Sequence, residues 1–218
     1  MSTDTGPIKT RLFWTWDHST EWLLNKPGMQ NMGASNYYSR TPEAFLEDYS
    51  RLLIWCGKHH YNGVVVWGLL RDCHGGVEAA KKLCDVANEA GVRLLCGVGL
   101  NAYGGVYYEG DSPYSLEQHL IKQPDLYATA LDGQKMVFDF GIAGRRLSHH
   151  ACPSRKENQE FAVESLQWLF NTLPGLGGVQ METGDTGFCR CELCQARREH
   201  PEPDAVQSWD DMALMYPM

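Results

Sequence analysis

The chain of 218 residues has an ordinary globular composition, with 43% hydrophobic and 21% charged residues, 22 glycines and 10 prolines. These proportions exclude a disordered, collagen-like or coiled-coil protein, and a chain of this length can bury a sizeable core without disulfide bonds. Its 19 basic and 27 acidic residues give a net charge of −8. We therefore expect no nucleic acid and no anionic membrane as a partner, since both bind proteins through basic residues.

Targeting and membrane-spanning patterns are missing from the sequence, which predicts a cytoplasmic protein. Residues 1–7 are polar and lack the basic and apolar stretches of a secretion signal. The longest apolar runs, such as residues 63–68, are far shorter than the ~20 residues that cross a bilayer. Without an export signal, we expect the eight cysteines to be reduced thiols, with a metal site among them as one use.

Strand-like and helical patterns alternate along the chain. Strand patterns occur at residues 11–16, 63–67, 92–98 and 179–182. The apolar faces expected for the helices between them consist of Phe45, Tyr49, Leu52, Leu53 and Cys56, then Val77, Ala80, Leu83, Cys84 and Ala87, then Phe161, Leu166, Leu169 and Phe170. Thr41 is expected to cap the first helix, and Ser154 and Glu157 to form a capping box at the third. The alternation predicts an α/β fold of βαβ units around a parallel sheet.

The number of strands indicates an incomplete barrel. Four strands are half of a (β/α)8 TIM barrel, which takes ~250 residues. A small open α/β domain also fits the pattern, but we favour the N-terminal half of a barrel. Residues 1–218 would then be a single partial TIM-barrel domain with an insertion at about residues 101–150, truncated after the start of a helix at residues 208–215. Because a half barrel leaves sheet edges exposed, we expect self-association or pairing with a missing C-terminal half.

Polar side chains follow each of the four predicted strands. The carboxyl ends of parallel strands meet at one rim, where the active sites of such folds lie. The candidate residues are Trp16, Asp17 and His18 after the first strand, Arg71, Asp72 and His74 after the second, Asn101 and Tyr103 after the third, and Glu182 and Asp185 after the fourth. Aromatic faces beside carboxylates and amides suit a sugar, so we expect a carbohydrate substrate. The alternative for the tryptophans is simple core packing.

Glu182 is the candidate general acid/base. It ends an apolar strand, where a carboxylate is costly unless it is solvated or used in catalysis. Asp185 lies three residues later, in a turn from which it can orient Glu182 or a substrate hydroxyl. The alternative is a structural salt bridge between Glu182 and Arg71.

Three cysteines within six residues, Cys189, Cys191 and Cys194, have the spacing of zinc ligands. Zinc takes a tetrahedral set of ligands with Zn–S bonds of ~2.3 Å, so a fourth ligand must come from elsewhere. Cys152 is the best candidate, and Cys96 or a histidine is the alternative. A zinc ion with four protein ligands would be structural and would fix the loop after the fourth strand. The alternative is a group of reduced thiols without metal.

Residues 151–159, residues 177–182 and the Cys-x-Cys-x-x-Cys motif together resemble the strand-four region of glycoside hydrolase TIM barrels. They are most similar to the zinc-carrying β-galactosidases of the clan A type. The resemblance implies an acid/base role for Glu182, a nucleophile on a seventh strand beyond the end of this chain, and zinc binding by Cys152, Cys189, Cys191 and Cys194. The family has Asn-Glu where this chain has Met181-Glu182, so the amide that contacts the sugar 2-hydroxyl is missing.

The opening segment at residues 13–20 is also similar to glycoside-hydrolase-like barrel proteins without an assigned activity. We therefore expect a glycoside hydrolase-like, carbohydrate-active protein, and expect the 218 residues alone to be inactive or nearly so. One alternative is a metal-dependent barrel isomerase or lyase in which His18, Asp72, His74 and Glu182 hold a divalent ion. The other is a carbohydrate-binding protein without catalysis.

Overall fold

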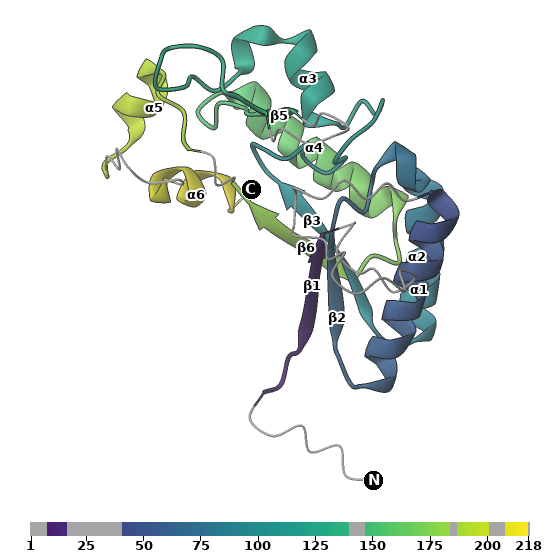
Figure 1. Ribbon diagram of the computed structural model, residues 1–218. Helices are drawn as coiled ribbons and strands as arrows, with labels where there is room; N and C mark the ends of the chain where they lie inside the picture. Colours follow the sequence, from purple (N-terminus) through teal and green to yellow (C-terminus); the bar gives the residue numbers. More distant parts are fainter. Residues whose placement is uncertain (1–7, 17–40, 140–146, 184–186, 201–207, 218) are drawn as a thin grey trace.

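A sheet of four parallel strands forms the centre of the protein (Figure 1). The computed structural model describes residues 8–16, 41–139, 147–183, 187–200 and 208–217. The strands are β1 (Leu12–Trp16), β2 (Gly63–Trp67), β3 (Arg93–Gly99) and β6 (Gly178–Glu182), and they lie in the order β1-β2-β3-β6. Each strand therefore pairs with the next one of the sheet along the chain, as in a TIM barrel. This confirms the α/β fold of βαβ units.

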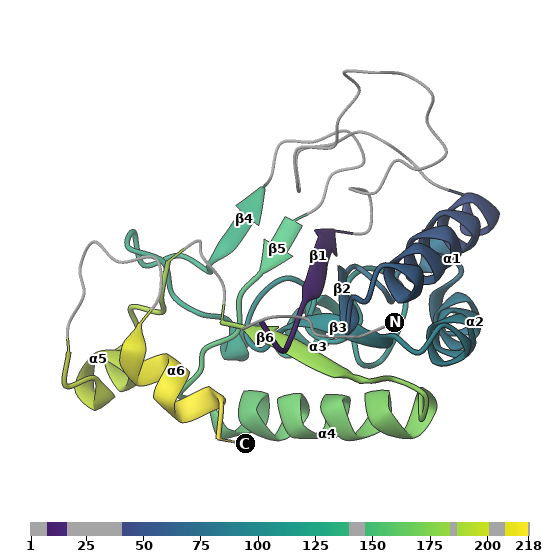
Figure 2. The ribbon, with the colours of Figure 1, turned by 90° about the horizontal axis from the view of Figure 1, so that it is seen from below.

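Three long helices cover one face of this sheet (Figure 2). They are α1 (Pro42–Lys58), α2 (Gly76–Glu89) and α4 (Lys156–Thr172). The predicted apolar face of α1 is fully buried. Thr41 caps this helix as expected, because its hydroxyl accepts a hydrogen bond from the Ala44 amide at 3.2 Å. The main hydrophobic core lies between these helices and the sheet.

Helix α4, the third of the three predicted helices, departs from its prediction in two ways. It begins at Lys156 without a side-chain cap, so the expected capping box of Ser154 and Glu157 is wrong. The Ser154 hydroxyl instead bonds to Cys194 and accepts a hydrogen bond from Arg197. Phe170, expected in the core, is 42% exposed.

The second face of the sheet is partly open, because the four strands form an incomplete ring. We call it the inner face, since it corresponds to the inside of a barrel. Alternate residues of β2 point to the two faces: Val64 and Val66 pack toward the helices, and Val65 and Trp67 pack on the inner face. Trp14 on β1 is 48% exposed. A closed barrel would bury such a side chain among the inward-pointing residues of other strands.

Gly97 makes room for the largest side chain of the inner face. A Cβ atom at this position would lie 2.5 Å from the Trp67 ring. We expect Gly97→Ala to displace the indole and to lower the free energy of unfolding by about 1–3 kcal/mol, the usual cost of overpacking. Urea denaturation measures this cost. In a Trp67→Ala background the same substitution should cost much less, and an equal cost in both backgrounds would show that the contact is not responsible.

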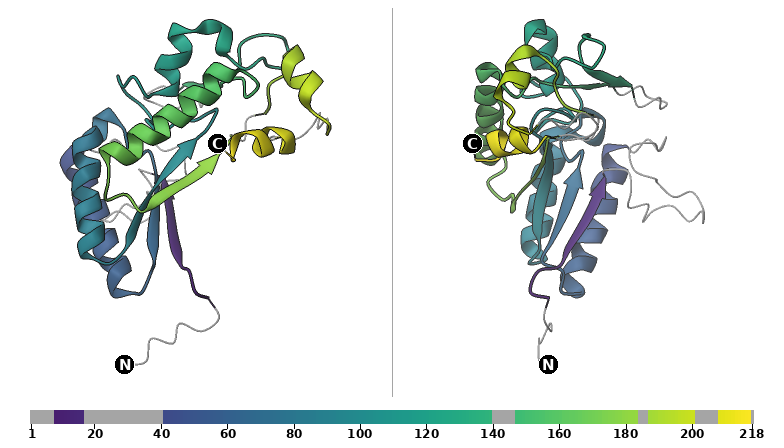
Figure 3. Two further views of the ribbon diagram at one scale, coloured as in Figure 1. Left: turned by 180° about the vertical axis from the view of Figure 1, so that it is seen from behind. Right: turned by 90° about the vertical axis from the view of Figure 1, so that its left-hand side faces the viewer.

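The remaining elements lie beyond the carboxyl ends of the strands (Figures 1 and 3). Between β3 and α4 the chain forms α3 (Leu116–Lys122) and the antiparallel pair β4 (Val137–Asp139) and β5 (Leu147–His149). After β6 come the short helices α5 (Glu192–Arg197) and α6 (Trp209–Met215), and 3-10 turns occur at Asp72–His74 and Pro124–Leu126. None of the described helices is both long and apolar enough to cross a membrane.

Candidate functional site

Glu182 and Asn101 lie next to each other at the carboxyl ends of the central strands. Glu182 is the last residue of β6 and pairs in register with Gly99 of β3. Its backbone carbonyl accepts a hydrogen bond of 2.7 Å from the Leu100 amide, one residue before Asn101. All four strands are parallel, so these two residues share a rim with the ends of β1 and β2.

A hydrogen-bonded row on the inner face ends at Glu182. The side-chain oxygen of Gln180, Oε1, accepts hydrogen bonds from the indole N–H groups of Trp67, at 2.6 Å, and Trp14, at 3.4 Å. Its amide nitrogen donates to Oε1 of Glu182 at 3.2 Å. Tyr103, a predicted sugar contact, packs its ring edge-on against Trp67 with the centroids 5.8 Å apart. No sequence motif singles out Gln180, although its spacing of two from Glu182 puts both side chains on the same face of the strand.

Tyr216, just after α6, also approaches Glu182. Its hydroxyl donates a hydrogen bond of 3.5 Å to the backbone carbonyl of Met181. Burial raises the pKa of the Tyr216 hydroxyl, and the negative charge of Glu182 raises that pKa further. The end of α6 therefore lies beside the rim, a placement that no motif in the sequence indicates.

The predicted residues after β2 are engaged with other parts of the fold. Arg71 forms an ion pair of 3.1 Å with Glu109. Its partner is therefore Glu109 and not Glu182, the partner expected if Glu182 had a purely structural role. Asp72 accepts hydrogen bonds from the Tyr107 hydroxyl and from the Asp111 amide. His74 is 2% exposed and stacks on Phe45 of α1 with ring centroids 4.5 Å apart. Asp72 and His74 thus hold the start of α2 against α1 and the segment after β3.

Three candidate residues, Asp17, His18 and Asp185, lie outside the described residues. The backbone of Trp16 pairs in register with that of Trp67. Among the described residues, the four clustered cysteines are the only group of three or more potential metal ligands that lie close together. The structure therefore places the backbones of Asn101 and Glu182 at neighbouring strand ends, and it places Asp72 and His74 in packing contacts.

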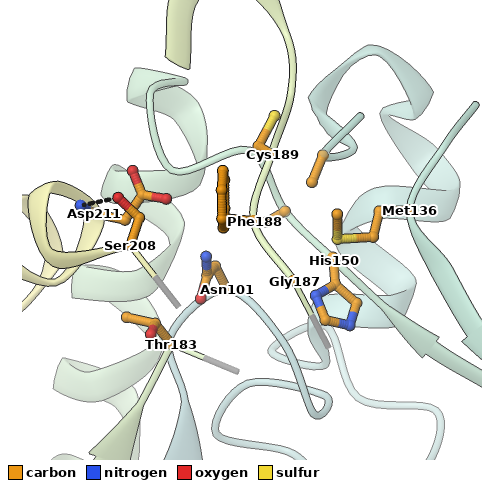
Figure 4. Close-up of a pocket in the computed structure, with 11 residues that line it drawn as sticks. Asn101, Met136, His150, Thr183, Gly187, Phe188, Cys189, Ser208 and Asp211 are labelled. Atoms are coloured by element: carbon orange, nitrogen blue, oxygen red, sulfur yellow. Dashed lines mark hydrogen bonds between the residues drawn. The ribbon is translucent and has the colours of Figure 1, made fainter. Parts of the chain in front are cut away.

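A small pocket lies between the ends of β3 and β6, the β4–β5 pair and α6 (Figure 4). Its polar lining includes Asn101, Thr183, His150, Ser208 and Asp211. The Asn101 side-chain oxygen is buried and has no hydrogen-bond partner among the described residues. Burial, reinforced by the neighbouring histidine, lowers the pKa of His150 to about 4, so its ring is neutral at pH 7. Asn101, Thr183 and the neutral His150 ring offer uncharged hydrogen-bonding groups, and the Asp211 carboxylate of the lining is paired with Arg197 and Arg198.

Four cysteine side chains converge at one side of this pocket. The Sγ atoms of Cys152, Cys189, Cys191 and Cys194 all lie within 4.8 Å of one another. Cys152 Sγ lies 3.5 Å from Cys194 Sγ and 3.6 Å from Cys191 Sγ. Tetrahedral zinc with Zn–S bonds of ~2.3 Å requires sulfur atoms about 3.8 Å apart, so the four thiols fit this ion. Cys96, the alternative fourth ligand, is instead buried in the main core.

Hydrogen bonds within the cluster favour a thiolate at Cys194, and those with Cys189 and Cys194 raise the pKa of the Cys152 thiol. The Thr129 amide donates to Cys189 Sγ at 3.3 Å, and the Ser154 hydroxyl lies 3.0 Å from Cys194 Sγ. Hydrogen bonds from Cys152, then from Cys189 and from Ser154, lower the pKa of the Cys194 thiol. Burial in the apolar core has the opposite effect elsewhere, because it raises the pKa of Cys56 and of Cys84 to about 11.

An ion-pair network attaches α5 and α6 to the cysteine cluster. Asp211, which is 3% exposed, bonds to both Arg197 and Arg198. Arg198 also donates to the Cys189 carbonyl, and Arg197 Nε donates to the Ser154 hydroxyl at 2.9 Å. The positive charges therefore lie close to the thiols, where they would offset the negative charge of four thiolates around a metal ion such as zinc.

Ser154→Ala tests this outer layer of contacts. We expect the variant to bind zinc about 10–100-fold more weakly, because the hydroxyl that links Arg197 to Cys194 is lost. Competition with a metal-sensitive chelator measures the affinity. Ser165→Ala is the matched control, since that buried serine bonds within α4 at Phe161. Equal zinc affinities for both variants would contradict this role of Ser154.

Neither protein-family models nor curated protein sequences match the chain, whereas solved structures do. The GH36 α-galactosidase AgaA from Geobacillus stearothermophilus superposes with a TM-score of 0.52 at 12% identity, over 95% of this chain and 25% of that one. A variant of AgaA in complex with 1-deoxygalactonojirimycin gives a TM-score of 0.50 at 12% identity, with the same coverage of 95% and 25%. The maltogenic α-amylase AmyB from Thermotoga neapolitana gives a TM-score of 0.50 at 10% identity, over 79% and 38%.

These similarities concern the fold. The chain spans well under half the length of these enzymes, between 25% and 38%. Their barrels share the parallel sheet and its helices with this chain. The chain therefore has the fold of part of a TIM barrel, similar to the barrels of these enzymes.

Proposed function

We propose that this chain supplies one half of a glycoside hydrolase active site, with Glu182 as the general acid/base. The observation that carries the proposal is the position of this carboxylate. It ends the fourth parallel strand on the inner face, next to Asn101, in a fold of the glycoside hydrolase type. A carboxylic acid at this rim can protonate the glycosidic oxygen as the bond breaks, and the resulting carboxylate can then take a proton from water.

Glycoside hydrolysis by this route needs a second carboxylate, which we expect outside these 218 residues. It would stand on one of the strands that complete the barrel. A separation of ~5–5.5 Å from Glu182 would give retention of configuration, and one of ~6.5–9.5 Å would give inversion.

The substrate we propose is a neutral glycoside. The exposed Trp14 indole on the inner face offers a surface on which a sugar ring can stack. Asn101 offers a side-chain amide at the rim. Tyr103 packs against Trp67 and so supports the inner face next to the rim. Asp17, His18 and Asp185 are proposed as further lining residues. A galactoside is the first choice, because the cysteine region resembles that of β-galactosidases and because AgaA, which has a similar fold, is an α-galactosidase.

We also propose that Cys152, Cys189, Cys191 and Cys194 hold a structural zinc ion. All four positions of the tetrahedron would be filled by protein, so the ion would have no place for water or substrate. Its role would be to fix the loop after β6 and the helices α5 and α6.

Binding of 1-deoxygalactonojirimycin to the 218-residue protein tests the proposal. The ring nitrogen of this iminosugar is protonated at neutral pH and pairs with a carboxylate. We expect titration calorimetry to detect binding, and Glu182→Gln to weaken it at least about tenfold through the loss of a charge-assisted hydrogen bond.

Glu89→Gln is the matched control, because Glu89 is exposed at the end of α2, where the chain enters β3. Undetectable binding, or equal binding by the Glu182 and Glu89 variants, would contradict the proposed site.

A further inference from the structure

The amide of Gln180 is engaged at both of its ends. Its carbonyl oxygen accepts from Trp67 and Trp14, at 2.6 and 3.4 Å. Its nitrogen donates to Oε1 of Glu182 at 3.2 Å and to the backbone carbonyl of Met181 at 3.3 Å. The two ends of one small group therefore connect two indoles to the candidate acid/base.

The two indoles determine which way this amide points. An indole N–H is only a donor, so it needs an acceptor opposite it. The flipped amide would direct its own N–H groups at the indole N–H groups of Trp67 and Trp14, so that donors would face donors. It would also turn its carbonyl oxygen toward the Glu182 carboxylate, where two acceptors repel. Both effects favour the observed orientation, in which Gln180 donates to Glu182.

Strand register explains how Trp67 reaches Gln180 across an intervening strand. Trp67 of β2 stands opposite Gly97 of β3, and Gly97 stands opposite Gln180 of β6. With no side chain at position 97, the indole can lie over β3 and donate to the next strand. Trp67 is fully buried and has Tyr103 against its ring, so its N–H is a fixed donor.

We propose that Gln180 is a positioning residue for Glu182. The indoles of Trp67 and Trp14 hold the amide, and the amide donor holds one oxygen of the Glu182 carboxylate at the rim. The catalytic meaning of this arrangement rests on the proposed acid/base function. The coupling between the four side chains does not, and it is present in the 218-residue protein itself.

Nuclear magnetic resonance of the indole N–H groups tests this coupling. A change of charge on Glu182 alters the polarisation that passes through the Gln180 amide to the Trp67 indole. We expect the Trp67 indole signal to shift with pH at the same midpoint as the Glu182 carboxyl carbon signal. In Glu182→Gln this shift should be lost. Trp168 of α4, which stacks on Tyr114, is the internal control and should not follow Glu182.

Two variants separate positioning from packing. Gln180→Met keeps a side chain of similar length and a weak sulfur acceptor toward the indoles but has no donor toward Glu182, so the common midpoint should disappear while the fold remains. Gln180→Leu removes both contacts, and the Trp67 signal should then stop responding to Glu182.

A Trp67 signal that ignores pH in the wild type, or that shifts equally in Glu182→Gln, would overturn the inference. Failure of iminosugar binding with the coupled titration intact would instead reject the hydrolase function and leave the positioning role standing.

Discussion

The purified 218-residue protein is expected to contain one zinc ion per chain, and Cys194→Ser is expected to lose most of it. Structural zinc bound by four thiolates contributes about 10–16 kcal/mol of apparent binding free energy in small domains. Here the buried apolar cluster around the cysteines is small, with Ala128 as its only other fully buried member among the described residues. Metal ligation would therefore supply most of the stability of this region.

Loss of zinc should unfold the cysteine region and spare the main core. The main core between the sheet and α1, α2 and α4 contains none of the four ligands. We expect chelation to abolish hydrogen-exchange protection in residues 187–200 and 208–217 and to leave α1 and β2 protected. Elemental analysis and hydrogen exchange measure the two effects.

Cys73→Ser is the control for this prediction, since Cys73 is exposed and lies outside the cluster. It should retain the full zinc content. A zinc-free protein from zinc-supplemented cells, or a Cys194→Ser variant with undiminished zinc, would contradict a structural metal site.

Glu182→Gln should reduce glycoside hydrolysis by about 10²–10⁴-fold in a barrel completed by its remaining strands, the usual contribution of a general acid/base. The glutamine amide has a similar shape but cannot give a proton to the leaving oxygen. The loss should be larger for aryl glycosides with poor leaving groups, because acidic phenols depart without protonation. Steady-state kinetics across a series of phenols measures this dependence.

Glu89→Gln again serves as the control and should retain wild-type turnover. The same fractional loss for every leaving group would mean that Glu182 acts in some other way, and unchanged turnover would reject its catalytic role.

The sheet and its helices were predictable because their signals are local. The valine run of β2 is buried on both faces and was predicted as a strand from its continuous apolar character, whereas the apolar residues of α1 recur at helical spacing, which predicted a helix. The rim position of Glu182 followed from the same reading, since parallel strands present their carboxyl ends together. The cysteine motif likewise predicted a cluster that includes Cys152.

Other features depend on contacts between distant parts of the chain. Ser154 fits a capping-box pattern, but its hydroxyl forms hydrogen bonds with Cys194 and Arg197, about forty residues later in the chain. Asp72 follows a strand, yet its partners come from the segment after β3. Gln180 matters because the strand register aligns it with Gly97 and Trp67. A sequence pattern predicts where a strand ends, but it does not predict which residues from other segments contact that end.

Affinity labelling tests the carbohydrate role of Glu182 most directly. An N-bromoacetyl galactosylamine carries an electrophilic carbon two bonds beyond the nitrogen that replaces the glycosidic oxygen, within reach of an acid/base at that oxygen. A carboxylate there displaces bromide and forms an ester, which peptide mass spectrometry locates. The account predicts esterification at Glu182 that free galactose slows. Labelling spread evenly over surface carboxylates, with no protection by galactose, would contradict it.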